Sequence, residues 1–382
     1  MIVGIDAVNT RGGGGVTHLV ELLRAANPAA HGFSKVILWS SQATLAQVDD
    51  RPWLTKMTMP ALNKGLPFRA AWQRFVLSGA ARSAGCDVLL IFGGSYAGSF
   101  APVVAQNSNL LPFDMRELLR FGWSARTLKF LALRATQTRA FQRSAGVIFL
   151  SEAAKDAVLR TIGGTKAATA IVPHGVDKRF AMPPRSQKPI SAYSEATPFR
   201  LLYVSQVDMY KHQWRVVEAV AQLRAEGLPV TLELVGAAYP PALEILRATM
   251  HRVDPAGAFV KYVGGVMHTD LPARYAGADM CVFASTCETF GQIVTEAMSA
   301  GTPIACSNRS AMPEVLGDAG VYFDPEEPAD IARALREMIA SPELRARKAQ
   351  MAFERAQTFT WARSAAQTFA LLARIAGAHG AR

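Results

Sequence analysis

The 382-residue sequence contains only four cysteines, and none of them forms a Cys-x-x-Cys pair. Cys86, Cys281, Cys287 and Cys306 lie in or beside apolar runs. Structural zinc sites and disulfide frameworks both need cysteines at characteristic spacings. We therefore expect four buried, reduced thiols with no catalytic or metal-binding role.

Long hydrophobic runs are also absent. A membrane-spanning helix needs roughly 20 nearly uncharged apolar residues, and the nearest stretch, 88–105, is interrupted by three glycines and a proline. The opening residues MIVGIDAVNT place Asp6 inside their apolar run and have no basic segment before it. This favours a first β-strand over a secretion signal. We expect a cytoplasmic protein.

Acidic residues are in the minority, with 30 Asp and Glu against 41 Lys and Arg, which gives a formal net charge of +11. Basic side chains concentrate over 116–143, where Glu117 is the only acidic residue and apolar side chains alternate with the charges. This pattern predicts a basic amphipathic helix that lies on anionic lipid headgroups. A solvated helix face is the alternative. Because no nucleic-acid-binding motif accompanies the charge, we expect an anionic membrane surface as partner and no nucleic acid.

Length and composition favour two domains, because 382 residues exceed a usual single core and half of them are hydrophobic. Strand-like runs alternate with helical stretches in both halves, which is typical of parallel sheets with right-handed crossovers. The expected strands are 2–6, 36–40, 88–92, 103–106 and 147–151, then 200–205, 231–236, 260–263, 280–284, 303–307 and 320–323.

A polar, proline-rich stretch separates the two halves. The sequence therefore predicts an α/β protein of two Rossmann-like, doubly wound domains that face each other across a cleft. We expect the first domain over 1–180, a linker over 181–198 and the second domain over 199–360. A C-terminal helix over 361–382 is expected to pack back on the first domain.

Glu288 and Glu296 flank a predicted strand-to-helix junction. The apolar run 282–285 predicts a strand, 289–291 a tight turn and 293–300 a helix. Nucleotides bind at such junctions in α/β folds, because the helix N-terminus offers unpaired N–H groups to anions. A nearby carboxylate can accept hydrogen bonds from sugar hydroxyls, so the pair suits a glycosyl nucleotide. A helix cap and a solvated helix residue remain the alternative reading.

A glycine-rich turn follows the first expected strand. Gly13, Gly14 and Gly15 come after Gly12 and precede an amphipathic stretch, 17–26. A backbone without side chains can pass close to a ligand phosphate. The turn matches neither the GxGxxG nor the Walker pattern, which disfavours dinucleotide and ATP sites. A plain tight turn is the alternative.

Six motifs, taken in order, resemble glycosyltransferase family 4, whose members are retaining enzymes of the GT-B fold. They are GGGGV, VPHGVD at 172–177, YKHQ at 210–213, ETFGQIVTEAMSAGTP at 288–303, MPEVLGDAGVYFDP, and FTW at 359–361. The resemblance implies a hexosyltransferase that uses a nucleotide sugar. The YKHQ loop and the stretch QNSNLLPFD look most like O-antigen and capsule mannosyltransferases.

That similarity implies GDP-mannose as donor, a growing lipid-linked glycan or oligosaccharide as acceptor, and a place at the inner face of a bacterial plasma membrane. UDP-N-acetylglucosamine, UDP-glucose and dTDP-rhamnose remain open as donors. A sugar-nucleotide epimerase and a non-catalytic, basic peripheral-membrane scaffold are the alternative functions.

The resemblance also implies roles on the donor side. Glu288 would contact the sugar hydroxyls, Glu296 the ribose, and Lys211 the diphosphate leaving group. Backbone N–H groups would hold the sugar or the diphosphate at Phe290, Gly291 and Gln292. Many family members carry a Gly-Arg pair before the lysine, whereas this chain has Ser205-Gln206. We consider Arg215 and Arg309 as substitutes for the missing arginine.

The acceptor side offers fewer candidates. At the family's acceptor position the chain has Gln106 and Asn107, and neither side chain titrates usefully. This fits the mechanism that the resemblance implies, in which the leaving phosphate takes the acceptor proton on the same face. Asn107, His18 and His174 are the acceptor-side candidates. No DxD motif and no His/Cys cluster is present, so we expect no metal and no cofactor beyond the donor.

Overall fold

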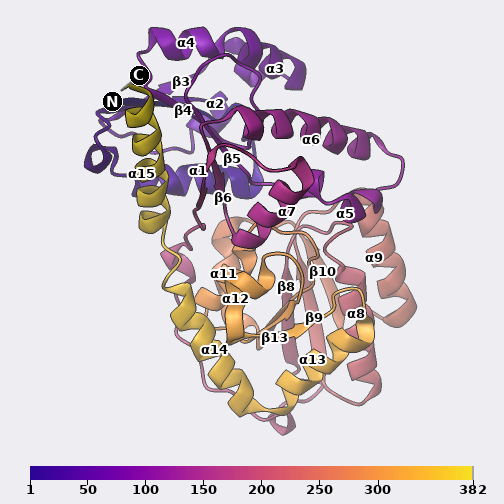
Figure 1. Cartoon of the computed structure of the whole chain (residues 1–382). Helices are drawn as coiled ribbons and strands as arrows, with labels where there is room; N and C mark the ends of the chain where they lie inside the picture. The colour runs from indigo at the N-terminus through magenta and orange to yellow at the C-terminus, as the bar shows by residue number, and fades with distance from the viewer. Residues whose placement is uncertain (381–382) are drawn as a thin grey trace. The chain divides into compact units, whose positions relative to one another are not determined.

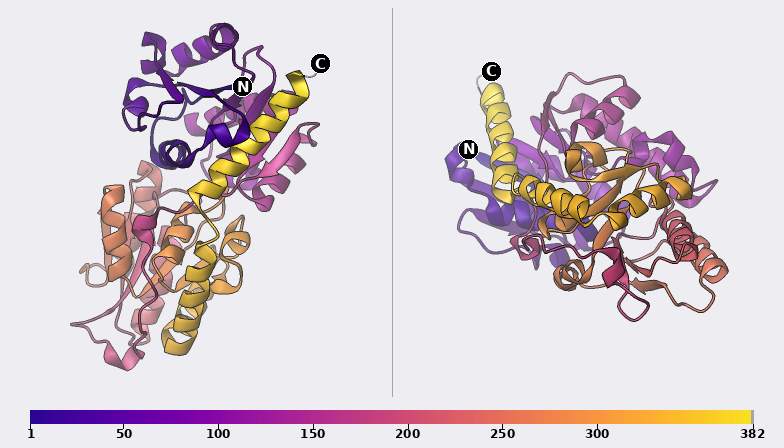
Figure 2. Two further views of the ribbon diagram at one scale, coloured as in Figure 1. Left: turned by 90° about the vertical axis from the view of Figure 1, so that its left-hand side faces the viewer. Right: turned by 90° about the horizontal axis from the view of Figure 1, so that it is seen from below.

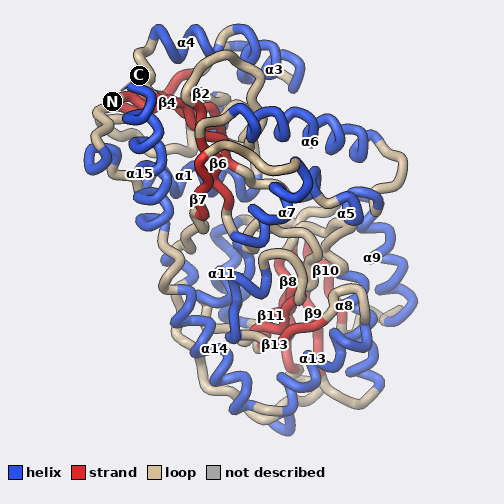
Figure 3. The backbone as a smooth tube through the Cα atoms, viewed as in Figure 1, coloured by secondary structure: helices blue, strands red, loops and turns tan. Residues whose placement is uncertain are grey.

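The structure is a computed structural model that describes residues 1–380 (Figure 1). The chain forms two compact units, one of residues 1–175 together with the residues from Thr360 onward, and one of residues 176–359. In each unit all strands pair in parallel, and helices cover the sheet (Figure 3). The expected fold class, two Rossmann-like α/β domains, is confirmed.

The first unit contains a seven-stranded sheet in the order β3-β2-β1-β4-β5-β6-β7. Its strands are β1 Ile2–Asp6, β2 Lys35–Trp39, β3 Leu54–Met57, β4 Val88–Ile91, β5 Val103–Gln106, β6 Gly146–Phe149 and β7 Ala168–Ile171. The winding direction reverses between β1 and β4, so the loops after these two strands diverge there. The two edge strands, β3 and β7, were not predicted, because LTKM and ATAI are half-exposed and lack an apolar run.

The helices of the first unit include the C-terminal helix. They are α1 Gly13–Ala25, α2 Gln42–Leu45, α3 Leu66–Phe75, α4 Leu77–Ser83, α5 Met115–Leu119, α6 Ala125–Arg143, α7 Glu152–Ile162 and α15 Trp361–Gly380. Helix α15 lies alongside this unit (Figure 2) and packs on α1, where Phe369 and Leu372 share a core with Leu19 and Leu22. The predicted C-terminal helix thus lies in the first unit, and Ala381 and Arg382 are outside the described residues.

The prediction of one basic helix over 116–143 is wrong. The segment forms two helices, α5 and α6, because Gly122 adopts a left-handed conformation with φ of 58°. Ser124 then caps α6, with its Oγ accepting from the Thr127 N–H at 3.2 Å. Two of the apolar side chains in the segment, Phe121 and Phe130, are buried and pack on each other. Part of the apolar face therefore belongs to the core of the unit.

The second unit contains a six-stranded sheet in the order β10-β9-β8-β11-β12-β13. Its strands are β8 Phe199–Val204, β9 Val230–Val235, β10 Val260–Gly264, β11 Met280–Phe283, β12 Ile304–Ser307 and β13 Val321–Phe323. Its helices are α8 Gln213–Ala225, α9 Pro240–Val253, α10 Leu271–Gly277, α11 Gln292–Ser299, α12 Met312–Leu316, α13 Pro328–Ala340 and α14 Pro342–Ala356. All six strands predicted for this half are present, and the winding reverses between β8 and β11.

The predicted linker, 181–198, is part of the second unit. The Met182 N–H donates to the Ser299 carbonyl at 3.0 Å, and the Tyr193 hydroxyl donates to Asp279 Oδ1 at 3.0 Å. The fully buried Arg345 donates from Nε to Gln187 Oε1 at 3.1 Å. The chain therefore passes between the units at 175–176 and again at 359–360, not at 180 and 360 as predicted. These contacts could not be predicted from the local, proline-rich composition, because their partners lie far away in sequence.

Two further expectations concern membranes and thiols. Over residues 1–380, no helix combines the length and the apolar character that crossing a bilayer requires. All four cysteines are free thiols, and Cys281, Cys287 and Cys306 are buried. Burial raises the pKa of the half-buried Cys86 thiol to about 11, so this thiol stays protonated near neutral pH.

Candidate active site

The candidate donor site lies where the second sheet changes its winding direction. Strands β8 and β11 are neighbours and run parallel, so the loops that follow them begin at the same edge of the sheet. Lys211 lies in the loop after β8 and Glu288 in the loop after β11. Lys211 Nζ donates a hydrogen bond to Glu288 Oε1, forming an ion pair. The fold thus joins two residues that lie 77 positions apart.

The Lys211 side chain is only 9% exposed. Its ammonium lies 5.0 Å from the ring centroids of both Tyr210 and Phe283. Its backbone carbonyl accepts a hydrogen bond from the buried Tyr203 hydroxyl. A cation held in such surroundings interacts more strongly with an anion than an exposed lysine does, because the local dielectric constant is low. The Lys211–Glu288 ion pair therefore holds a positive charge in a fixed position before any ligand binds.

The loop that carries Lys211 is fixed to the loop after β11. The Thr286 N–H donates to the Tyr210 carbonyl at 2.9 Å, and Thr286 Oγ1 lies 3.2 Å from His212 Nε2. The loop after β8 also approaches the end of β9 very closely. A Cβ on Gly236 would lie 2.0 Å from the Ser205 carbonyl oxygen, so this position requires glycine. These contacts set the position of Lys211.

Ser310 holds the backbone of Glu288. Its Oγ accepts from the Glu288 N–H at 2.9 Å and donates to the Glu288 carbonyl at 2.7 Å. Beyond Glu288, Gly291 adopts a left-handed φ of 95° and precedes α11. Phe290, Gly291 and Gln292 therefore form the N-terminal end of this helix, the position predicted for them. An N-terminal helix end favours an anionic ligand.

Glu296 is buried, with 2% of its surface exposed. Its Oε1 lies 3.2 Å from His268 Nε2, and its Oε2 accepts from the Tyr275 hydroxyl at 3.4 Å. Burial raises the pKa of Glu296, and the bond from His268 opposes that rise. The same bond raises the pKa of His268 above 6.5. The solvated helix residue considered from sequence is excluded, because this carboxylate points into the unit.

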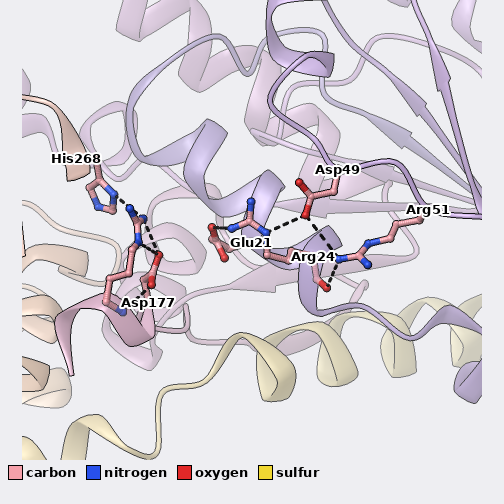
Figure 4. A network of polar contacts seen from close by, with 7 residues as sticks. Glu21, Arg24, Asp49, Arg51, Asp177 and His268 are labelled. Atoms are coloured by element: carbon pink, nitrogen blue, oxygen red, sulfur yellow. Dashed lines mark hydrogen bonds and ion pairs between the residues drawn. The ribbon is translucent and has the colours of Figure 1, made fainter.

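His268 belongs to a line of charged groups that ends on Glu296. Arg179 Nη2 lies 3.4 Å from His268 Nδ1, and Arg179 forms an ion pair with Asp177 at 2.7 Å. Figure 4 shows Asp177 and His268 at the two ends of this group. The ring of Phe180 packs edge-on against His268 at 5.3 Å. His268 was not predicted from the sequence, because a single histidine after a strand carries no motif signal.

Figure 4 also shows a separate network in the first unit. Arg24, in the last turn of α1, forms ion pairs with Glu21 and Asp49, and Arg51 lies 3.6 Å from Asp49. Arg24, Asp49 and Arg51 are 37–45% exposed, so solvent screens this network and it adds little to stability.

Gln206 stands where many family members have an arginine, and the structure shows its surroundings and those of the two arginines considered as substitutes. Gln206 is exposed just beyond β8, and its carbonyl accepts from the Gln213 side chain at 2.9 Å. Arg215 forms an ion pair with Glu218 at 3.1 Å, and Arg309 forms one with Asp324 at 2.5 Å. Both arginines considered as substitutes are thus engaged by carboxylates, as Lys211 is by Glu288.

The glycine-rich segment of the first unit is helical and not a turn. The amphipathic stretch recognised in the sequence began at Thr17, but α1 begins at Gly13 after an extended Gly12, so Gly13, Gly14 and Gly15 form the first turn of the helix. A Cβ at Gly12, Gly13 or Gly14 would meet no described atom within 4 Å. The space beside this helix N-terminus is therefore open among the described residues.

His18 lies beneath the surface of the first unit, with 4% of its surface exposed. The side-chain nitrogen of Gln106 lies 3.0 Å from His18 Nδ1, and the rings of His174 and Trp361 lie 4.1 Å and 5.5 Å away. Burial, assisted by His174, lowers the pKa of His18 well below 6.5, so the ring is neutral. Asn107 is also fully buried and donates to the Asn109 carbonyl at 3.1 Å.

His174 is half-buried, so it is the more accessible of the two acceptor-side histidines. With respect to metals, no cluster of three or more His, Cys, Asp or Glu side chains in the described part of the chain is arranged to hold an ion.

The link between His268 and Glu296 predicts a measurable titration. The pKa of His268 is higher in the folded unit than in the unfolded chain. The interaction of His268 with Glu296 therefore stabilises the folded unit fully below pH 6.5, and this stabilisation is lost as the pH rises through the folded-state pKa. Glu296→Gln removes the charge and should lower the pKa of His268. NMR titration of the His268 ring measures this pKa directly.

The matched control for this titration is Glu244→Gln, which neutralises an exposed carboxylate on α9. It should leave the His268 pKa unchanged. An unchanged pKa in Glu296→Gln as well would show that the carboxylate does not govern the histidine.

Comparison with known proteins shows which family the second unit resembles. Residues 187–355 match the family described as "Glycosyl transferases group 1". Over 244 residues the chain is 29% identical to a glycogen synthase of Mycobacterium tuberculosis, a match that covers 63% of this chain and 56% of that protein. Over 218 residues it is 31% identical to a GDP-mannose-dependent alpha-(1-6)-phosphatidylinositol dimannoside mannosyltransferase of the same species, covering 56% and 54%.

A shorter match, of 110 residues at 36% identity, links the chain to the O-antigen chain mannosyltransferase B of Escherichia coli and covers 29% of each protein. The chain therefore spans little more than half the length of the first two curated relatives and less than a third of the length of the other. Among solved structures, sucrose-phosphate synthase of Thermosynechococcus elongatus has the same fold, with a TM-score of 0.76 over 99% of this chain and 100% of that one, at 20% identity. In sequence, residues 187–355 thus resemble the glycosyl transferases of group 1.

Proposed function

We propose that the protein transfers a hexose from a nucleotide sugar to a growing glycan, and that the donor is GDP-mannose. The observation that carries this proposal is the pairing of Lys211 with Glu288 at the winding reversal of the second sheet. The match of residues 187–355 to the group 1 glycosyl transferases supports the reaction class.

In this proposal Lys211 neutralises the diphosphate as it leaves. The bond between the sugar C1 and the phosphate oxygen breaks, and negative charge develops on the diphosphate. A preorganised cation stabilises that charge without reorganisation at the moment of reaction. When Lys211 turns to the diphosphate, Glu288 is released to accept hydrogen bonds from the donor sugar. Glu296, supported by His268, accepts hydrogen bonds from the ribose.

The acceptor proton goes to the leaving phosphate in our proposal. Gln106 and Asn107 do not titrate, and the neutral ring of His18 is buried. Transfer on the face that the diphosphate leaves would retain the configuration at C1. Lys211 and the N-terminal end of α11 supply the positive charge, so we propose that no metal takes part.

The choice of GDP-mannose rests on the names of two relatives. One is called GDP-mannose-dependent, and the other is an O-antigen chain mannosyltransferase. UDP and dTDP sugars are the competing donors. The same two names support a lipid-linked or polysaccharide acceptor for this chain.

A thermal-shift screen across nucleotide sugars tests the donor. A ligand that binds only the folded state raises the apparent stability by mass action. We expect GDP-mannose to raise the melting temperature, and UDP-glucose, UDP-N-acetylglucosamine and dTDP-rhamnose to raise it less. A larger shift with any of these three would replace GDP-mannose as donor.

Lys211→Ala tests the reaction. Loss of a charge that acts on the leaving group should reduce transfer by about 100-fold or more, as measured by release of nucleoside diphosphate in the presence of EDTA. Lys261→Ala, which removes an exposed lysine of the same unit, is the matched control. Gln206→Arg should keep or raise the rate. Full turnover in Lys211→Ala, or loss of wild-type turnover in EDTA, would contradict the proposed chemistry.

We further propose that the first unit binds the inner face of the plasma membrane through α5 and α6. The most exposed apolar side chains of this segment are Trp123, Leu119 and Leu128, which are 99%, 66% and 62% exposed. Basic residues accompany them along α6. Apolar insertion combined with basic charge is the usual requirement for stable attachment to anionic lipid.

Vesicle co-sedimentation tests the membrane proposal. Replacing Arg126, Lys129 and Arg134 by glutamine should lower binding to phosphatidylglycerol vesicles by about 100-fold, because each of the basic residues near the surface adds roughly 1 kcal/mol. Neutralising Arg160 and Lys166, two exposed basic residues elsewhere in the unit, should have less effect. Equal binding by the wild type and the triple variant would refute attachment through α6.

A further inference from the structure

A basic pocket of about 680 Å³ lies in the first unit, apart from the residues discussed so far. Four separate segments form it: α3, the loop between β4 and β5, the last two turns of α6 and the end of α15. Its basic and hydroxyl-bearing residues include Arg74, Arg139, Arg143, His379 and Tyr96. We call this the amino-edge pocket. Its volume is that of a small-molecule site.

The amino-edge pocket gathers positive charge without a matching carboxylate. Its described lining contains no Asp or Glu. Within residues 1–380, Arg74, Arg139 and Arg143 form no ion pair with a carboxylate. Arg139 and Arg143 are four positions apart on α6, so they share one helix face, and like charges at this spacing destabilise a helix. An anion between them would remove that cost.

The face of α6 that lines the pocket has a regular spacing. Thr136, Arg139, Ala140 and Arg143 recur at the intervals of a single helical face. Ala140 adds only a methyl group to this face, and Thr136 adds a hydroxyl. At the end of α15, His379 Nδ1 lies 3.0 Å from the Ile375 carbonyl and donates to it, which leaves Nε2 for a ligand.

The opposite wall is rigid. Ser78 Oγ accepts from the N–H groups of Ser99 and Phe100 at 2.7 Å and 3.1 Å, and the Tyr96 hydroxyl accepts from the Phe100 N–H at 2.8 Å. A Cβ on Gly98 would lie 2.6 Å from Ser78 Oγ, so the loop closes this tightly only with glycine. A fixed wall limits the entropy lost when a ligand is ordered.

The pocket lies at the edge of the sheet opposite to the acceptor-side candidates. Val103, which lines it, is the first residue of β5, and Ala145 directly precedes β6. Asn107 follows the last residue of β5. All strands of this sheet are parallel. The amino-edge pocket therefore lies at one end of β5 and Asn107 at the other, about one strand length apart, or roughly 13 Å.

We propose that the amino-edge pocket binds a phosphate-bearing ligand. Guanidinium groups pair bidentately with phosphate oxygens. Three arginines match a phosphate group, which carries one negative charge as a diester and about two as a monoester or a diphosphate and offers several acceptor oxygens, better than a single sugar carboxylate. Both a soluble phosphorylated metabolite and an anionic lipid headgroup present this chemistry. The site is independent of the proposed transfer reaction.

Isothermal titration with inorganic pyrophosphate at fixed ionic strength tests the proposal. We expect the wild type to bind through two components, because the proposed donor site also attracts diphosphate. Arg139→Gln combined with Arg143→Gln should weaken one component by about 10- to 100-fold, since hydrogen bonds to charged groups are strong. Lys211→Ala should leave that component intact, so a failure of the proposed function does not affect this outcome.

The matched control is Arg160→Gln combined with Lys166→Gln, which removes the same charge from the same unit outside the pocket. It should preserve pyrophosphate binding. Flotation with phosphatidylglycerol and phosphatidylcholine vesicles then identifies the source of the phosphate. Selective loss of phosphatidylglycerol binding in the pocket variant, but not in the control, assigns a lipid headgroup, whereas loss of pyrophosphate binding alone assigns a soluble ligand. Unchanged binding of both probes by the pocket variant would overturn the proposal.

Arginine labelling of the wild type keeps the test decisive if the pocket variant does not fold. Phenylglyoxal modifies exposed guanidinium groups, and mass spectrometry locates the modified residues. Pyrophosphate, or phosphatidylglycerol vesicles, should protect Arg139 and Arg143 several-fold while leaving Arg160 unprotected. Equal modification of all three arginines with and without both ligands would contradict the assigned site.

Discussion

The ion pair between Lys211 and Glu288 is the interaction on which the arrangement of the second unit's site depends. It joins the loops after β8 and β11 where the sheet reverses its winding. A pair with so little exposure is not a simple source of stability, because removing two ions from water costs about as much as their attraction returns. In the proposed reaction, the pair holds the Lys211 cation near the N-terminal end of α11, and the cation exchanges Glu288 for the diphosphate.

Around this pair the fold fixes each backbone segment separately. Ser310 holds Glu288, Thr286 holds the loop that carries Lys211, and Gly236 permits two loops to approach closely. Glu296 is placed by different means, since His268 and Tyr275 satisfy its buried carboxylate. The two glutamates therefore have distinct environments. Glu288 is linked to a cation that can leave it, whereas Glu296 is held in one orientation.

Much of this fold and site follows from the sequence because the decisive signals are local. Apolar runs identified the buried strands, and the strand-to-helix junction at 282–300 identified both glutamates. The missed features depend on distant partners. Arg345 and Asp279 draw the supposed linker into the second unit, and His268 reaches Glu296 across 28 residues. The break between α5 and α6 had a local signal in Gly122 and Ser124, which the strong charge pattern of the segment masked.

A crystal structure of the protein with the nucleoside diphosphate of its donor tests the central claim most directly. We predict that Lys211 Nζ leaves Glu288 and contacts the diphosphate, that the N-terminal end of α11 faces the same group, and that Glu296 accepts hydrogen bonds from the ribose. A diphosphate bound elsewhere, with the Lys211–Glu288 ion pair intact and Glu296 away from the ribose, would contradict the account.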